Sequence, residues 1–233
     1  MKGLIILFGE SFRLGSQGNR NRGSNESYNE QIKAAESHMR FIKHLKTTKN
    51  IDIDVHISSY ETQFSDNLNA VYLKVLGAFT FYHGLLGQNT LIQNALKNIT
   101  NIDEYDFALI MRIDLFLKNK FDETFDPYSD KILFPSICFK PHHKAGNHPR
   151  VNDMMMFVPK KYFNLLNKIN LHHGTWYDLV VDHGRSYQDL DVMLNTYHDS
   201  DSEKDYNPIY YIVNRPENSI HHTKDLFDKY NFE

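Results

Sequence analysis

The sequence predicts an α/β domain, and three observations support this. A short apolar segment rich in branched residues, 3–8, opens the chain and is followed directly by Gly9, which is typical of a central parallel strand. Helical and strand-like patterns then alternate along the 233 residues. A content of 41% hydrophobic and 24% charged residues is that of a globular chain. The length suits a single domain with one substantial core.

Composition also limits the classes of partner and the cellular compartments that we expect for this protein. The formal net charge of -3 argues against a nucleic-acid-binding protein, whose domains usually carry a basic face. The single cysteine, Cys138, cannot form an intramolecular disulfide. The start of the chain lacks a signal-peptide pattern, and no apolar segment approaches the roughly 20 residues that span a bilayer. We therefore expect a cytoplasmic protein without a transmembrane segment.

The first half of the chain shows two strand-to-helix steps. After the first strand, residues 9–25 are rich in Gly, Ser, Asn and Arg, and a loop of this length usually binds something. Ser27 to Glu30 fits a capping box, and the apolar spacing predicts a helix over 27–45. Residues 52–58 alternate as a strand does and lead into the polar segment 58–62, where a second binding loop is expected.

The second half continues the alternation. Helical spacing predicts two helices, over 66–84 and 90–99, and 106–112 is again a buried strand. Further elements are expected as strands at 131–134, 154–158 and 209–213 and as helices at 160–169 and 187–197.

The loop after the first strand is the first candidate site. Glycines allow the backbone to approach a ligand closely, and guanidinium groups bind diphosphates through paired hydrogen bonds. The segment matches neither the Walker pattern nor the dinucleotide fingerprint, and the alternative is a solvated flexible loop. The nucleotide-binding candidates of the first loop and of the polar segment 58–62 are Gly9, Glu10, Ser11, Phe12, Arg13, Arg20, Ser59 and Tyr60.

Acidic residues near strand ends form the second group of candidates. Asp114, two residues after Arg112, is placed to hold a divalent cation, and the alternative is an Arg–Asp ion pair that closes a turn. Asn152 and Asp153 fit hydrogen bonding to sugar hydroxyls or a general base, or else a turn that begins a strand. Asp189 and Asp191 could reach the site, although the helix dipole also favours acidic residues in a first turn. The histidines show no zinc-site spacing, and no nucleophile-elbow sequence is present.

Three segments together resemble a known family: the opening strand with its Gly-rich turn, Tyr105 to Asp114, and Val151 to Pro159. The sequence resembles the GT-A-type glycosyltransferases, in particular polysaccharide and lipopolysaccharide-type transferases of bacteria and large viruses that carry Arg-x-Asp in place of Asp-x-Asp. The resemblance implies a GT-A-like, Rossmann-like fold with a mixed, mainly parallel sheet flanked by helices. It implies one domain over 1–233, with a nucleotide-binding part of about 1–118 and an acceptor-side part of about 119–233.

The same resemblance implies a site and a reaction. The first loop would hold the nucleotide, and Asn152 and Asp153 would face the donor sugar or the acceptor. Asp114 would be a ligand of Mn²⁺ or Mg²⁺, completed by His222 or its neighbour His221, although Arg112 in place of the first Asp puts metal dependence in doubt.

We therefore expect transfer of a sugar from a UDP- or GDP-sugar to a hydroxyl of a glycan or glycoconjugate, in polysaccharide or glycan biosynthesis. The general base is expected to be Asp153, Asp189 or Asp191, among which the sequence does not choose. The alternatives are a nucleotidyltransferase, an inactive nucleotide- or glycan-binding module of this fold, and an α/β scaffold whose arginine loop contacts a partner protein.

Overall fold

The computed structural model describes residues 1–14, 21–84, 86–134, 137–138, 150–151, 154–166, 186–187 and 210–213. Its main sheet has seven strands in the order β12-β8-β11-β6-β1-β4-β5. These strands are β1 (Lys2–Gly9), β4 (Asp52–Tyr60), β5 (Leu76–Tyr82), β6 (Phe107–Arg112), β8 (Leu133–Phe134), β11 (Met155–Pro159) and β12 (Ser186–Tyr187).

The other strands form three two-stranded sheets: β2 (Arg13–Leu14) with β3 (Asn21–Arg22), β7 (Leu115–Leu117) with β13 (Tyr210–Ile212), and β9 (Ile137–Cys138) with β10 (Arg150–Val151). The helices are α1 (Asn25–Lys49), α2 (Ser65–Tyr72), α3 (Gln88–Lys97), α4 (Asn119–Thr124) and α5 (Phe163–Leu166), with 3₁₀ turns at Ile102–Glu104 and Lys160–Tyr162.

The sheet is mixed and mainly parallel, which confirms the predicted fold class. Strand β1 is parallel to both of its neighbours, β4 and β6, and β4 is parallel to β5. Strand β11 runs antiparallel to β6 and β8, and β12 is parallel to β8. Residues 3–8 form the centre of the sheet, as their continuous apolar character predicts, because a strand with neighbours on both sides and helices on both faces is buried throughout.

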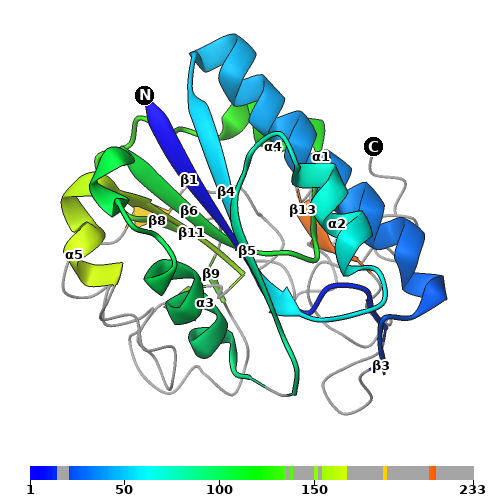
Figure 1. Ribbon diagram of the computed structural model, residues 1–233. Coiled ribbons are helices and arrows are strands. Elements are labelled where there is room, and N and C mark those ends of the chain that lie inside the picture. The colour runs from blue at the N-terminus through cyan, green and yellow to red at the C-terminus, as the bar shows by residue number, and fades with distance from the viewer. Residues whose placement is uncertain are drawn as a thin grey trace.

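Helices cover both faces of the sheet (Figure 1). Alternate residues of β1 point to opposite faces, so Ile5 and Leu7 pack in the core under α1 and α2, while Leu4, Ile6 and Phe8 pack in the core under α3 and α5. No helix in the described part of the chain is both long enough and apolar enough to span a bilayer.

Several element predictions need correction. The first helix begins at Asn25 with Ser24 as its N-cap residue, so Ser27 lies in the first turn and donates to the carbonyl of Ser24 at 2.8 Å. Residues 66–84 are not one helix, because α2 ends at Tyr72 and β5 follows. A short apolar segment with aromatic residues does not distinguish a strand from a helix by period alone.

Two smaller corrections concern strand ends. Ser59 and Tyr60 are the last two residues of β4 rather than part of a loop, because pairing with β5 continues to the end of the strand. Tyr187, expected to begin a helix, lies in the short strand β12.

Candidate functional site

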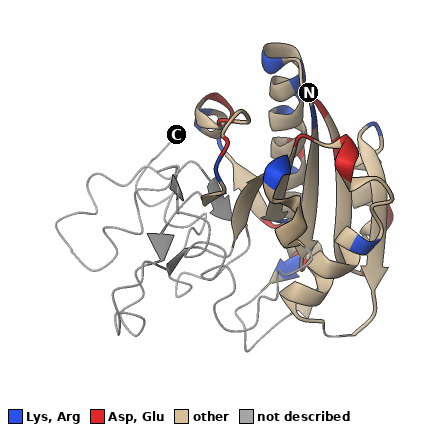
Figure 2. Ribbon diagram, turned by 90° about the vertical axis from the view of Figure 1, so that its left-hand side faces the viewer, with Lys and Arg blue, Asp and Glu red and all other residues tan. Residues whose placement is uncertain are grey.

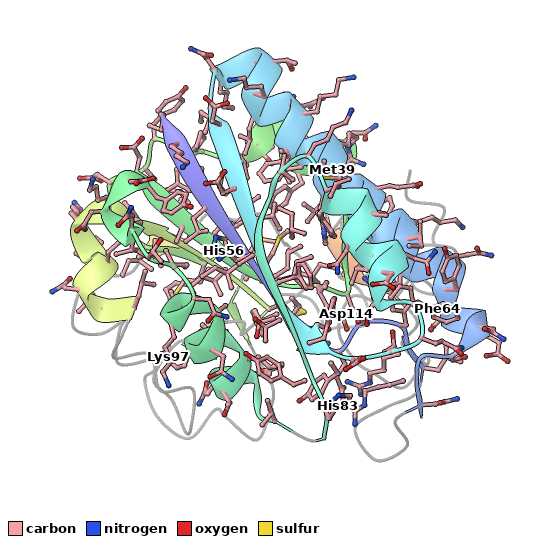
Figure 3. The ribbon with its side chains drawn as sticks, in the orientation of Figure 1. Met39, His56, Phe64, His83, Lys97 and Asp114 are labelled. Atoms are coloured by element: carbon pink, nitrogen blue, oxygen red, sulfur yellow. The ribbon has the colours of Figure 1, made fainter. Side chains whose placement is uncertain are left out.

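The strand order defines where a ligand site is expected. From β1 the chain builds outward through β4 to β5, then returns by way of α3 to β6 on the other side of β1. The order therefore reverses between β1 and β6, and in open α/β sheets ligands bind at such a reversal, outside the carboxyl ends of the strands. Those ends are Gly9 in β1 and Arg112 in β6. Figure 3 shows Asp114 and His83 toward this end of the sheet.

The loop after β1 is held to the end of β4. Gly9 adopts φ +114° and Phe12 adopts φ +50°, so the chain turns sharply twice as it leaves the sheet. The hydroxyl of Ser59 donates to the Gly9 carbonyl at 2.8 Å and lies 3.0 Å from the hydroxyl of Ser11. Both serines are fully buried. The loop after β1 and the end of β4 therefore meet through these two serine side chains.

A buried ion pair lies in the same loop. Arg13 Nη1 donates to Glu10 Oε2 at 2.6 Å, and both side chains are at least 93% buried, since 6% and 7% of their surfaces remain exposed. Arg22, on the paired strand β3, brings a second guanidinium, 4.0 Å from Glu10 and over the ring of Tyr60. It also donates to the carbonyl of Gly84 at 3.1 Å. The buried Tyr60 ring therefore packs against the Arg22 guanidinium.

A second buried ion pair lies at the end of β6. Arg112 Nε donates to Asp114 Oδ1 at 2.8 Å and Nη2 donates to Oδ2 at 2.5 Å, with 9% and 4% of the two side chains exposed. This bidentate contact is the ion-pair alternative that the sequence Arg112-Ile113-Asp114 predicted. Both oxygens of Asp114 therefore accept hydrogen bonds from one cation.

Gln31, a fully buried residue of α1, joins the two loops that carry these ion pairs. Its side-chain oxygen accepts from the backbone N–H of Phe12 at 3.2 Å, and its nitrogen donates to the carbonyl of Ile113 at 2.8 Å. Gln31 is not among the residues predicted from the sequence. Its signal was a polar residue on the inner face of a helix, at helical spacing from the buried Ala34, Ala35 and His38.

Further polar residues of α1 hold β7, the strand that directly follows Asp114. The hydroxyl of Ser37 accepts from the N–H of Leu117 at 2.9 Å, and Arg40 donates to the Leu117 carbonyl. His38 Nε2 donates to the Leu115 carbonyl at 2.6 Å, so Nδ1 accepts from the hydroxyl of Tyr72 at 2.7 Å. Burial lowers the pKa of His38 to about 4, and the imidazole is therefore neutral at pH 7.

Charged groups of both signs meet at this strand edge. The guanidinium groups of Arg13, Arg22 and Arg112 lie among the carboxylates of Glu10, Asp114 and Glu61, the last of which follows β4 and pairs with His83. Elsewhere, basic and acidic residues are interspersed along the described part of the ribbon (Figure 2). The edge therefore combines buried cations with the position that the topology favours for a ligand.

Several candidates lie outside the described residues and stay predictions: Arg20, Asn152, Asp153, Asp189, Asp191 and His222. Met154, which follows Asp153 in the sequence, accepts at its carbonyl from the N–H of Arg112 at 2.9 Å. In the part of the chain that the structure describes, no three His, Cys, Asp or Glu residues gather as a metal site would need.

No protein-family model matches the chain, and no curated protein sequence matches it. Solved structures similar to it include β1,4-galactosyltransferase 7 of Drosophila, in complex with manganese, UDP-Gal and xylobiose (TM-score 0.43, 14% identity, 80% of this chain). The chain spans 63% of the length of that structure.

Two other similar structures have a TM-score below 0.5 as well. One is a glycosyltransferase involved in glycosylation of the major capsid of the virus PBCV-1, with a TM-score of 0.41 and 10% identity over 91% of this chain and 93% of the other. The second is 4-diphosphocytidyl-2C-methyl-D-erythritol synthase of Anaerococcus prevotii, with a TM-score of 0.45 and 10% identity over 80% and 85% of the two chains.

Proposed function

We propose that this protein is a glycosyltransferase that moves a sugar from a nucleoside diphosphate sugar to a hydroxyl of a glycan or glycoconjugate. The observation that carries the proposal is the pair of buried arginine–carboxylate contacts, Arg13 with Glu10 and Arg112 with Asp114, at the carboxyl ends of the two strands where the strand order reverses. The resemblance of the sequence motifs to GT-A-type transferases supports the same reaction.

The arginines of this edge suit the chemistry of the leaving group. In sugar transfer the acceptor oxygen forms a bond to the anomeric carbon while the bond from that carbon to the diphosphate oxygen breaks. Negative charge then develops on the departing diphosphate, and fixed cations in a water-poor site stabilise it. Arg13 and Arg112 are held by ion pairs before any ligand binds, so little reorganisation is needed.

A carboxylate would take the proton from the acceptor hydroxyl. Asp153, Asp189 and Asp191 are the candidates, and Asp153 is the one whose sequence neighbour Met154 lies beside Arg112. Single Asp→Asn changes at the three positions separate them, because loss of the base lowers the rate of transfer and leaves donor binding in place.

Donor binding is tested first by thermal unfolding with UDP-, GDP-, CMP- and dTDP-sugars, since a ligand that binds only the native state raises the apparent stability. We expect one nucleotide class to raise the Tm. Arg13→Gln should lower the affinity for that ligand by about tenfold to a hundredfold, because a hydrogen bond to a charged group contributes roughly 1.5–3 kcal/mol.

The matched control is Lys97→Gln, which removes a positive charge from the exposed end of α3 and should leave the affinity unchanged. Each variant is compared with its own ligand-free Tm. If no nucleotide sugar raises the Tm, the proposal is wrong.

Product analysis then separates the alternatives. A transferase releases a nucleoside diphosphate and extends the acceptor, whereas a nucleotidyltransferase releases pyrophosphate. A binding module of this fold would bind the donor and release neither product.

A further inference from the structure

We infer that this site binds the donor diphosphate without a divalent cation, because the guanidinium of Arg112 already occupies the carboxylate of Asp114. The inference rests on the proposed function and concerns how the same site neutralises its ligand. It departs from the expectation that Asp114 is a ligand of Mn²⁺ or Mg²⁺.

The geometry at Asp114 does not fit a metal ligand. Its two oxygens lie 2.8 Å from Nε and 2.5 Å from Nη2 of the same arginine, the parallel arrangement that binds a carboxylate most firmly. Both side chains are more than nine-tenths buried. To coordinate a cation, the carboxylate would have to use its remaining lone pairs while the positively charged Arg112 stayed hydrogen bonded to both of its oxygens.

Charge adds to the geometric argument. Mn²⁺ and Mg²⁺ favour several oxygen ligands, and carboxylates supply the negative charge that such sites need. The other buried carboxylate described at this edge, Glu10, accepts from Arg13 at 2.6 Å. A divalent cation would therefore meet two arginines that are fixed beside the two carboxylates, and like charges close together in a buried site repel strongly.

The local sequence explains why the pair forms. Arg112 ends β6 and Asp114 lies two residues further on, with the buried Ile113 between them. The N–H of Ile113 donates to the Phe8 carbonyl at 2.8 Å, and Gln31 holds the Ile113 carbonyl. The backbone between the two charged residues is thus fixed from both sides, and the pair is part of the packed structure.

The first experiment measures metal binding alone, by titrating the free protein with Mn²⁺ and following the signal of unbound Mn²⁺ by electron paramagnetic resonance. We expect the wild-type protein to leave this signal unchanged through the high-micromolar range. Arg112→Asp replaces the cation by a second carboxylate, and we expect it to bind Mn²⁺ at least about tenfold more tightly than the wild type.

Arg112→Gln serves as a second variant in case Arg112→Asp does not fold. It removes the cation without adding a charge, and it too should bind Mn²⁺ more tightly than the wild type. The inference is overturned if the wild type binds one Mn²⁺ and Asp114→Asn abolishes that binding. It is also overturned if the folded variants bind Mn²⁺ no better than the wild type.

The second experiment repeats the nucleotide-sugar thermal shift in EDTA and in Mn²⁺. Equal shifts in the two conditions support the inference, and a shift that EDTA abolishes contradicts it while leaving the proposed function in place. Absence of any shift in both conditions counts against the proposed function instead, so the two failures are distinguishable.

Discussion

Gln31 is the residue on which the geometry of the proposed site depends most. It has no charge and lies behind the two loops, yet it hydrogen bonds to the backbone of both, at Phe12 and Ile113. Each of those residues neighbours a member of one ion pair, Arg13 or Arg112. We therefore regard Gln31 as a positioning residue that sets the spacing between the two arginines.

Replacing Gln31 by Leu should lower both stability and ligand affinity. The change keeps the side chain near its original size but leaves the N–H of Phe12 and the carbonyl of Ile113 buried without this partner. We expect the free energy of unfolding to fall by about 2–6 kcal/mol, since each of the two groups costs about 1–3 kcal/mol. Chemical denaturation measures the loss, and calorimetric titration with the bound nucleotide sugar measures the affinity.

Asn29→Leu is the matched control, because Asn29 is an exposed amide on the same helix. It should change the free energy of unfolding by no more than about 0.5 kcal/mol and leave the affinity unchanged. Equal effects of the two substitutions would show that Gln31 has no special part in the site.

At the residue scale the sequence predicted which charged groups matter but not how they pair. Arg112 and Asp114 were expected either at a metal site or as an ion pair, and two residues of spacing fit both. The contact of Arg13 with Glu10 was not predicted, because two charged residues in a loop have many possible geometries. Gln31 could not be found by composition, since its importance comes from the two backbone segments that the fold brings to it.

At the scale of elements, α1 does more than cover the sheet. Its inner side carries Gln31, Ser37 and His38 among apolar residues, and these side chains hydrogen bond to the segment from Ile113 to Leu117. That segment leaves the main sheet after β6, and among the described residues β7 pairs with β13 in a two-stranded sheet. Side chains of the helix therefore satisfy backbone groups that a neighbouring strand would otherwise satisfy.

His38 makes this arrangement sensitive to acid. Burial lowers its pKa to about 4, a hydrogen bond to Leu115 and the charge of Asp114 oppose that effect, and the charge of Arg40 adds to it. The unfolded chain binds the proton near pH 6.5 and the folded chain does not. The stability of the protein should therefore be highest above pH 6.5 and should fall by about 3 kcal/mol between pH 6.5 and pH 4 on account of this residue.

Chemical denaturation of the wild type and of His38→Gln across this pH range measures the free energy of unfolding of each protein. The difference between the two gives the contribution of His38 at each pH. The variant should be less stable than the wild type at pH 7. It should also lack the part of the stability loss between pH 6.5 and pH 4 that His38 causes. If the free energies of unfolding of the wild type and the variant differ by the same amount from pH 7 to pH 4, protonation of His38 is not the cause of the acid sensitivity.

The elements also show where sequence patterns are ambiguous. Strands β1 and β6 were predicted because a central strand is apolar over most of its length. Strand β5 was missed because it lies at the end of the sheet, where its residues are partly exposed and include the 52%-exposed Phe79. The short β2–β3 pair was read as loop, since strands of two residues leave no periodic signal.

At the scale of the whole molecule, the strand order sets the position of the site. The four strands β5-β4-β1-β6 follow the order of the first half of a doubly wound sheet, and the reversal beside β1 brings together loops that are about a hundred residues apart in the sequence. The alternation of strands and helices predicted this class of fold. The sequence did not predict that β11 runs antiparallel to β6, which only the pairing of the two strands in the structure shows.

The most direct test of the account is hydrogen–deuterium exchange with and without the nucleotide sugar that gives the largest thermal shift. We predict slower exchange on binding in the peptides that contain residues 9–14 and 112–115, at the ends of β1 and β6. Protection confined to other parts of the chain, with a ligand that clearly stabilises the protein, would contradict the placement of the site at this edge of the sheet.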